Sequence, residues 1–385
     1  MKKKTAALLM TAALTASLLG GCGGNGTAES GSGDAAEETV ETAEDTAEEG
    51  AEESADTADG SEAADNGSAD NAGAGASYKV GIVQFVDDAS LNQIEAAIEA
   101  ELDAKAAELG VTFDYSDYTY NGQADSTVLN QIATELVASE VDVIVPIATP
   151  AAMIMQNATA DNQIPVVFSA VSDPVGAGLV ASLEAPGSNI TGTSDALNTE
   201  AVMDLMFAAD PDIQKVGLLY NKSEDSSKAP IEAAKAYCEE KGVEVIEKTG
   251  TTNDEISLAA DALIAAGAEA VFTPTDNTVM TAELAIYEKF IDAGVPHYTG
   301  ADSFALNGAF LGFGVNYVDL GTATADMVAE ILVNGADPAS TPVVTLDNGI
   351  ATVNTETAEA IGLDYSVFEG MCAEVKETVT AEEFE

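Results

Sequence analysis

Short apolar runs alternate with amphipathic stretches along the chain from residue 78 onward. Four of the runs have the length and composition of strands, at 79–86, 111–120, 141–146 and 165–171. The third is mostly β-branched and carries a single acid, as a strand buried on both faces would. Between the runs, apolar residues recur at helical spacing, as do Leu91, Ile94, Ile98, Leu102 and Leu109. Strands joined by helical crossovers predict a parallel α/β sheet.

The same pattern restarts near residue 215. Strands are expected at 215–220, 243–248, 269–274 and 295–299, with helices at 228–241, 254–266 and 279–293. The segments SNITGTS (188–194) and LGFGVN (311–316) are the expected crossings. We therefore predict an α/β fold of two doubly wound parallel-sheet lobes joined by crossing strands. The N-terminal lobe is expected to take 78–192 plus about 308–340, and the C-terminal lobe 193–307 plus about 341–385.

A basic start and a short apolar run precede the lobes. The run at 5–18 is too short to span a bilayer as a permanent helix, and it ends in LGGC at 19–22. This resembles a bacterial lipobox, which predicts a signal peptide at 1–21 and lipidation of Cys22; an ordinary signal peptide is the alternative. The Gly/Ser/Ala/Thr-rich, acidic stretch that completes 22–77 is expected to be a disordered tether.

Charge narrows the choice of ligand. The chain has 67 acidic and 13 basic residues, a formal net charge of −54, and all of its basic residues are lysines. Such a surface disfavours nucleic acid and anionic lipid as partners, and without a guanidinium group an anionic ligand lacks its usual clamp. A zwitterion or a small neutral molecule fits better, with an acid available for an ammonium group.

Catalytic signatures are missing from the sequence. The three cysteines, at positions 22, 238 and 372, have no close spacing; Cys238 and Cys372 could pair, but we expect both to be buried as small apolar residues. His297 is the one histidine, so neither a histidine-based triad nor a multi-histidine metal site can form. The loose GxGxxA match at 176–181 is interrupted by Pro186-Gly187, which argues against a nucleotide. We expect no enzyme activity, cofactor or metal.

Seven segments carry a resemblance to a known family: VGIVQFV (80–86), VPIATPAA (145–152), IPVVFSAVSDPVGAGLV (164–180), SNITGTSD (188–195), VGLLYNKSE (216–224), VFTPTDNTV (271–279) and TGADS (299–303). The chain resembles ABC-transporter substrate-binding lipoproteins, in the branch associated with uptake of tryptophan or tyrosine. The resemblance implies a type I periplasmic-binding fold that closes on a small molecule at the outer face of the cytoplasmic membrane. It also implies a membrane permease and an ATPase as partners.

The resemblance also implies a set of ligand-binding residues, each at or just past the carboxyl end of an expected strand. A ligand carboxylate would meet the Thr149 hydroxyl and the start of the helix at Pro150, and an α-ammonium would face Asp302, with Asp276 or Asp195 as alternatives. Family members often carry His-Pro where this chain has Asp88-Ala89, which leaves aromatic specificity open. The full set is Gln84, Thr149, Ala151, Ser169, Ala170, Asp195, Tyr220, Asn221, Thr275, Asp276, Asn277 and Asp302.

Plainer interpretations stand beside this one. Residues 274–277 could form only a turn and a helix cap, Asp302 could cap the next segment, and Tyr220 could pack at a strand end. The same fold could hold a nucleoside or a sugar, or could serve a signalling receptor as a ligand-sensing lipoprotein. An enzyme acting on cell-wall or peptide material is the remaining alternative.

Overall fold

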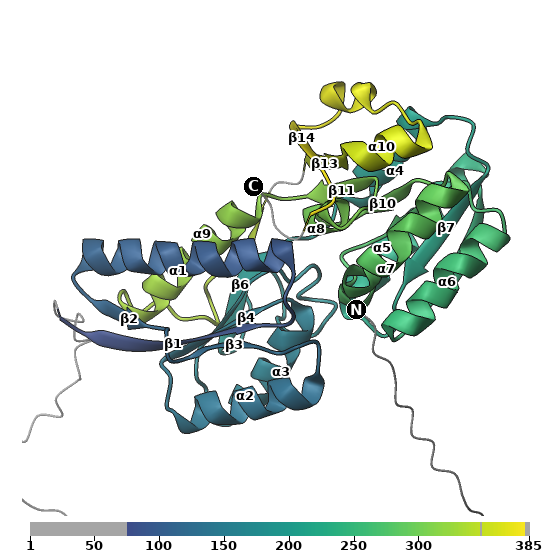
Figure 1. The fold of residues 1–385 in the computed structure, drawn as a ribbon. Helices are drawn as coiled ribbons and strands as arrows, with labels where there is room; N and C mark the ends of the chain where they lie inside the picture. Colours follow the sequence, from purple (N-terminus) through teal and green to yellow (C-terminus); the bar gives the residue numbers. More distant parts are fainter. Residues whose placement is uncertain (1–74, 347–348, 382–385) are drawn as a thin grey trace, which may run out of the picture. The chain divides into compact units, whose positions relative to one another are not determined.

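The computed structural model describes residues 75–346 and 349–381. It shows two α/β lobes, each built around a sheet that is largely parallel (Figure 1). The signal peptide, Cys22 and nearly all of the tether predicted above lie outside the described residues. Among the described residues, no helix is both long and apolar enough to cross a membrane.

The N-lobe sheet has the order β12-β6-β5-β4-β1-β2, with β3 also paired to β1, and all of these pairs are parallel. Its strands are β1 (Ser77–Gln84), β2 (Thr112–Asp114), β3 (Thr119–Asn121), β4 (Val143–Ile147), β5 (Val166–Phe168), β6 (Ile190–Ser194) and β12 (Val344–Thr345). The single strand expected at 111–120 is in fact β2 and β3, because the turn-forming Ser116 and Asp117 separate them. The strand expected at 165–171 ends at Phe168, before Ala170 takes a φ of 55°.

Helices cover both faces of this sheet (Figure 1). One face carries α1 (Ala89–Leu109) and α9 (Tyr317–Leu332), and the other carries α2 (Ser126–Ala138) and α3 (Thr149–Thr159). Strand alternation explains the division, since Val80 and Ile82 pack with α1 and α9 whereas Val83 packs with α2 and α3. Gly110 ends α1 with a φ of 69°, a left-handed conformation that glycine adopts without strain.

The C-lobe sheet has the order β14-β13-β11-β10-β9-β7-β8 and is parallel except where β13 meets β11. Its strands are β7 (Lys215–Tyr220), β8 (Glu244–Thr249), β9 (Ala270–Thr273), β10 (His297–Thr299), β11 (Leu311–Gly314), β13 (Ile350–Asn354) and β14 (Glu374–Thr378). Its helices are α4 (Thr199–Ala209), α5 (Asp225–Lys241), α6 (Asn253–Ala265), α7 (Asn277–Ala293), α8 (Asp302–Leu306), α10 (Thr355–Ile361) and the 3-10 helix η1 (Ser366–Gly370).

The chain passes between the two sheets at three places. It leaves the N-lobe after β6, returns from β11 to α9, which packs on α1, and leaves again between β12 and β13. Strand pairing therefore places β11 with the C-lobe and β12 with the N-lobe. All three crossings lie a few residues beyond the boundaries expected from the sequence.

Candidate functional site

A small pocket forms where helices from both lobes begin. Its walls come from the first turns of α1, α3, α5, α7 and α9, from the residue before α8, and from the segments that follow β5, β6 and β9. The lining residues are Ser90, Leu91, Ala148, Thr149, Ala170, Ser172, Asp195, Ser226, Thr275, Asn277, Met280, Ala301 and Tyr317. Helix N-termini present free N–H groups and positive dipole ends. The pocket is therefore suited to a ligand carboxylate, although no lysine of the described part of the chain lines it.

Side chains already cap α1, α7 and α9, so α3 and α5 are the helices with uncapped first turns at this pocket that remain for a ligand carboxylate. Ala148 precedes α3 with a φ of 81°, and no side chain caps the N–H groups of the first turn. Ala170, which follows β5, also has a positive φ of 55°. Non-glycine residues seldom adopt this conformation, and such strain is concentrated at binding sites. The two alanines hold the strand ends of β4 and β5 so that the first turn of α3 faces the pocket.

Asp195 supplies the pocket with a negative charge. It follows β6 directly, is 6% exposed, and accepts a hydrogen bond from Ser172 Oγ at 3.0 Å. Burial raises the pKa of Asp195 to about 6, and the Ser172 hydrogen bond offsets part of that effect. Ser172 Oγ also lies 3.2 Å from Thr275 Oγ1. The C-lobe thus reaches Asp195 through a chain of two hydroxyl groups.

Asp302 forms a second link between the lobes. Its Oδ1 accepts from Ser90 Oγ at 2.5 Å and its Oδ2 from Gln93 Nε2 at 3.3 Å, while the N–H of Ser303 donates to Ser90 Oγ at 3.1 Å. Burial raises the pKa of Asp302, and it raises that of the neighbouring Asp88 to about 6. Both oxygens of Asp302 therefore already have partners on α1, whereas Asp195 faces the pocket.

Five of the predicted residues line this pocket: Thr149, Ala170, Asp195, Thr275 and Asn277. The other seven do not line it, and they are hydrogen-bonded to or packed against other residues of the protein. Asp276 caps α7, where it accepts from the N–H groups of Val279 and Asn221 and from Ser227 Oγ. Burial, together with nearby Glu224, raises the pKa of Asp276 to about 7.

The remaining predicted residues are likewise bound to protein partners. Gln84 donates to the Val86 carbonyl and to Asn92 Oδ1, both at 2.7 Å. Ser169 lies among the hydroxyl groups of Thr193 and Thr324, and Ala151 is fully buried in α3. The Asn221 side-chain amide donates to the Thr278 hydroxyl. The Tyr220 hydroxyl donates to Glu247 at 2.7 Å, which fits the simpler interpretation that Tyr220 packs at a strand end. Cys238 is buried, Cys372 half-buried, and both are free thiols.

Eight lining residues were not in the predicted set: Ser90, Leu91, Ala148, Ser172, Ser226, Met280, Ala301 and Tyr317. One signal could have found most of them, because they occupy the first helical turn after a strand or the loop that precedes it. Ser172 lies four residues after β5, and Ser226 is the second residue of α5. Met280, by contrast, is one turn into α7, so its place depends on how deeply that helix enters the pocket.

Residues 79–377 match the family described as ABC transporter substrate binding protein. The chain belongs to this family. The "Tyrosine-binding protein" of Clostridioides difficile (strain R20291) is 31% identical over 286 residues, which cover 74% of this chain and 81% of that one.

Two solved structures are also similar to this chain. The first, from Streptococcus pneumoniae, is in complex with L-Trp; it is 31% identical, has a TM-score of 0.72, and covers 78% of this chain and 100% of that one. The second, the ligand-free, open structure of a substrate binding protein with adhesive properties from Clostridium difficile, is also 31% identical. Its TM-score is 0.60, and it covers 79% of this chain and 100% of that one.

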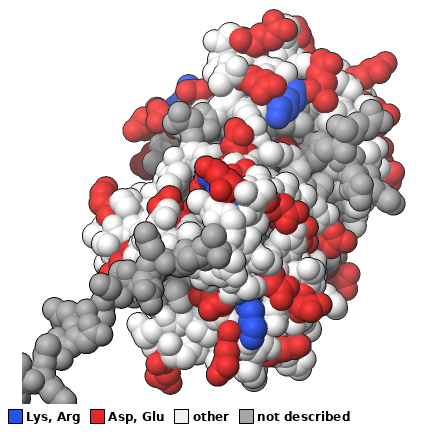
Figure 2. Space-filling model, turned by 90° about the vertical axis from the view of Figure 1, so that its left-hand side faces the viewer, with Lys and Arg blue, Asp and Glu red and all other residues white. Residues whose placement is uncertain are grey.

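The surface of this substrate-binding protein is strongly acidic. Figure 2 shows aspartate and glutamate side chains spread over the face in view, with few lysines among them. Several described lysines are engaged by acids, as Lys105 is by Asp326 at 2.7 Å and Lys289 by Asp261 at 2.9 Å. The field at this surface therefore repels free anions, and a ligand with its own positive group is better received.

Proposed function

We propose that this chain captures an α-amino acid, and specifically an aromatic one, as the extracytoplasmic binding component of an ABC importer. The observation that carries the proposal is the pairing of opposite preferences within one pocket. The uncapped start of α3 suits a carboxylate, and Asp195 suits an ammonium group. A zwitterion satisfies both. The names of the similar proteins, one tyrosine-binding and one solved with L-Trp, support an aromatic side chain.

Capture by closure of the two lobes follows from the contacts that the pocket needs. Its walls come from both lobes, so a ligand is fully held only when they meet. The pocket at Asp195 has a volume of about 20 Å³, whereas sites for small molecules measure roughly 300–1,000 Å³. The higher TM-score to the complex with L-Trp than to the open structure supports a nearly closed arrangement. The lobes must separate to admit a ligand.

Calorimetry on the purified full chain against the twenty L-amino acids tests the proposal. We expect binding of L-Tyr or L-Trp, and at least tenfold weaker binding of the corresponding amine without a carboxylate and of the corresponding acid without an amino group, since each lacks one pole. A nucleoside and a hexose complete the panel. Binding of either of these in place of every amino acid would refute the assignment.

Anchoring through Cys22 and delivery to a permease and an ATPase complete the proposal. The LGGC motif at 19–22 supports the anchor, and the family supports the transporter. Cells that express the chain should incorporate labelled palmitate into it, and the Cys22→Ser variant should not. Equal labelling of the two proteins, or no labelling of either, would contradict lipidation at Cys22.

A further inference from the structure

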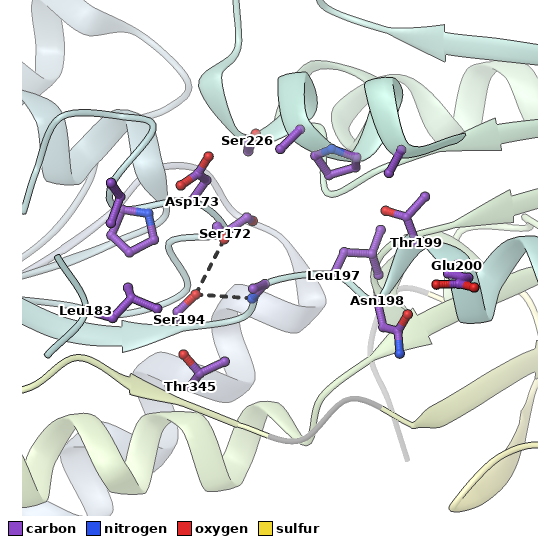
Figure 3. A pocket seen from close by; sticks show the side chains of 16 residues that line it. Ser172, Asp173, Leu183, Ser194, Leu197, Asn198, Thr199, Glu200, Ser226 and Thr345 are labelled. Atoms are coloured by element: carbon purple, nitrogen blue, oxygen red, sulfur yellow. Dashed lines mark hydrogen bonds between the residues drawn. The ribbon is translucent and has the colours of Figure 1, made fainter. Parts of the chain in front are cut away.

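A second cavity adjoins the pocket at Asp195 and shares Ser172 and Ser226 with it (Figure 3). This cavity measures about 430 Å³, within the range of small-molecule sites, whereas the pocket has room for about one water molecule. An amino acid whose charged groups meet Asp195 and α3 must therefore place its side chain in an adjoining space. The two shared serines place this cavity directly beside the pocket.

The walls of the cavity suit a ring. Most of the surface that encloses it is apolar, from residues that follow β5 and β6 and from α5: Pro174, Val175, Leu183, Leu197, Ala229 and Pro230. Among the described residues, its acids are Asp173, which accepts from the N–H of Gly176, and Glu200, and no lysine lines it. An acidic side chain is therefore excluded, whereas an aromatic ring would bury apolar surface.

One wall carries a polar group without a partner. Thr199 begins α4, is 5% exposed, and its Oγ1 is buried with no hydrogen-bond partner within the described residues. The helix does not need this hydroxyl as a cap, because the Asn198 side chain already accepts from the N–H of Ala201. Figure 3 shows Thr199 among the side chains around the cavity. A buried hydroxyl left unpaired costs free energy, and rotation of the Thr199 side chain toward the cavity would let a phenol hydroxyl or an indole N–H pair with it.

A third cavity, of about 480 Å³, lies beyond Met280, which it shares with the pocket. Its lining is more polar and includes Asp87, Asp88, Asn92 and Thr281. Burial of an aromatic ring there would release less free energy, because the ring would contact carboxylates and amides rather than apolar side chains. The cavity at Thr199 is therefore the better match for the side chain of an aromatic amino acid.

We propose that the cavity at Thr199 is the side-chain subsite of the bound amino acid, and that Thr199 Oγ1 hydrogen-bonds the polar atom of its ring. The inference rests on the proposed function, since it assigns the position of that ligand's side chain. It makes Thr199 a specificity-determining residue that distinguishes L-Tyr or L-Trp from L-Phe.

Calorimetry on the full-length Thr199→Val variant tests the contact, because valine keeps the shape and removes the hydroxyl. We expect affinity for L-Tyr or L-Trp to fall about five- to tenfold and affinity for L-Phe to change less than twofold. The melting temperature of the free variant should be unchanged or higher, since the hydroxyl has no partner to lose. Thr134→Val, at an exposed threonine of α2, is the matched control and should change none of these values.

A second variant, Ala229→Trp, tests the cavity itself by filling it from α5. Its affinity for L-Tyr, L-Trp and L-Phe should be at least tenfold lower than that of the wild type. If the wild-type protein binds an aromatic amino acid but both cavity variants retain its affinities, the subsite is refuted and the proposed function stands. An equal loss for L-Tyr and L-Phe in Thr199→Val refutes the contact to the ring. If the wild-type protein binds no amino acid, both proposals fall together.

Discussion

Replacing Asp195 with asparagine should weaken ligand binding while making the free protein more stable. The two effects have one origin, the burial of a carboxylate that has a single hydroxyl partner, Ser172. Asparagine has nearly the same shape, and its oxygen still accepts from Ser172. The variant thus removes the charge and little else.

The size of each effect follows from the structure. The pKa of Asp195 is raised from 3.8 to about 6, so its charged form costs about 3 kcal/mol at pH 7, as an upper figure. This cost is absent below pH 3.8, where the carboxyl is protonated in both the folded and the unfolded state, and it develops as the pH rises through 6. A hydrogen bond to a charged group contributes ~1.5–3 kcal/mol, so the lost ammonium contact should weaken affinity about 10- to 100-fold.

Calorimetry at pH 7 measures the affinity, and thermal unfolding at pH 7 and pH 4 measures the stability. We expect Asp195→Asn to melt higher than wild type at pH 7, with the difference shrinking toward pH 4. Wild-type affinity should itself decline as the pH falls below 6. Asp161→Asn is the control. It removes one negative charge from an exposed acid just beyond α3 and should show neither effect. A variant that binds normally and melts lower would refute the reasoning.

Three further changes test other parts of the fold. Gly321→Ala should lower the free energy of unfolding by ~1–2 kcal/mol, because the added Cβ would lie 2.6 Å from a backbone carbonyl oxygen of α1. Alanine usually favours a helix, so an unchanged or higher midpoint of urea unfolding would contradict this reasoning. Glu283→Leu should lower the free energy of unfolding by ~1–3 kcal/mol, because buried His297 loses the carboxylate that lies 3.0 Å from its Nδ1. Adding His297→Leu should restore part of that stability, and strictly additive losses would argue against the pair. Ser90→Ala removes the hydroxyl between α1 and Asp302, so calorimetry should show ~3- to 10-fold weaker ligand binding, and unaltered affinity would show that this link does not hold the closed form.

The order of elements could be predicted from the sequence because its causes are local. Apolar runs of strand length, amphipathic helices and a stop such as Gly110 depend on neighbours along the chain. The same local signals placed Thr149 and Thr275 just past strand ends, where both line the pocket. They failed at 111–120, where a two-residue turn divides what looked like one strand.

The role of each acid was decided only by the tertiary structure. Asp195, Asp276 and Asp302 follow strands or precede helices in similar local sequence, so all three were candidates for the ammonium group. Packing then gave Asp302 two partners on α1 and made Asp276 the cap of α7, and it left Asp195 facing the pocket. Partners more than 200 residues away along the chain, such as Ser90 for Asp302, leave no trace in local pattern. The sequence by itself therefore determined which residues would gather at the strand ends, and the meeting of the two lobes decided which of them line the pocket.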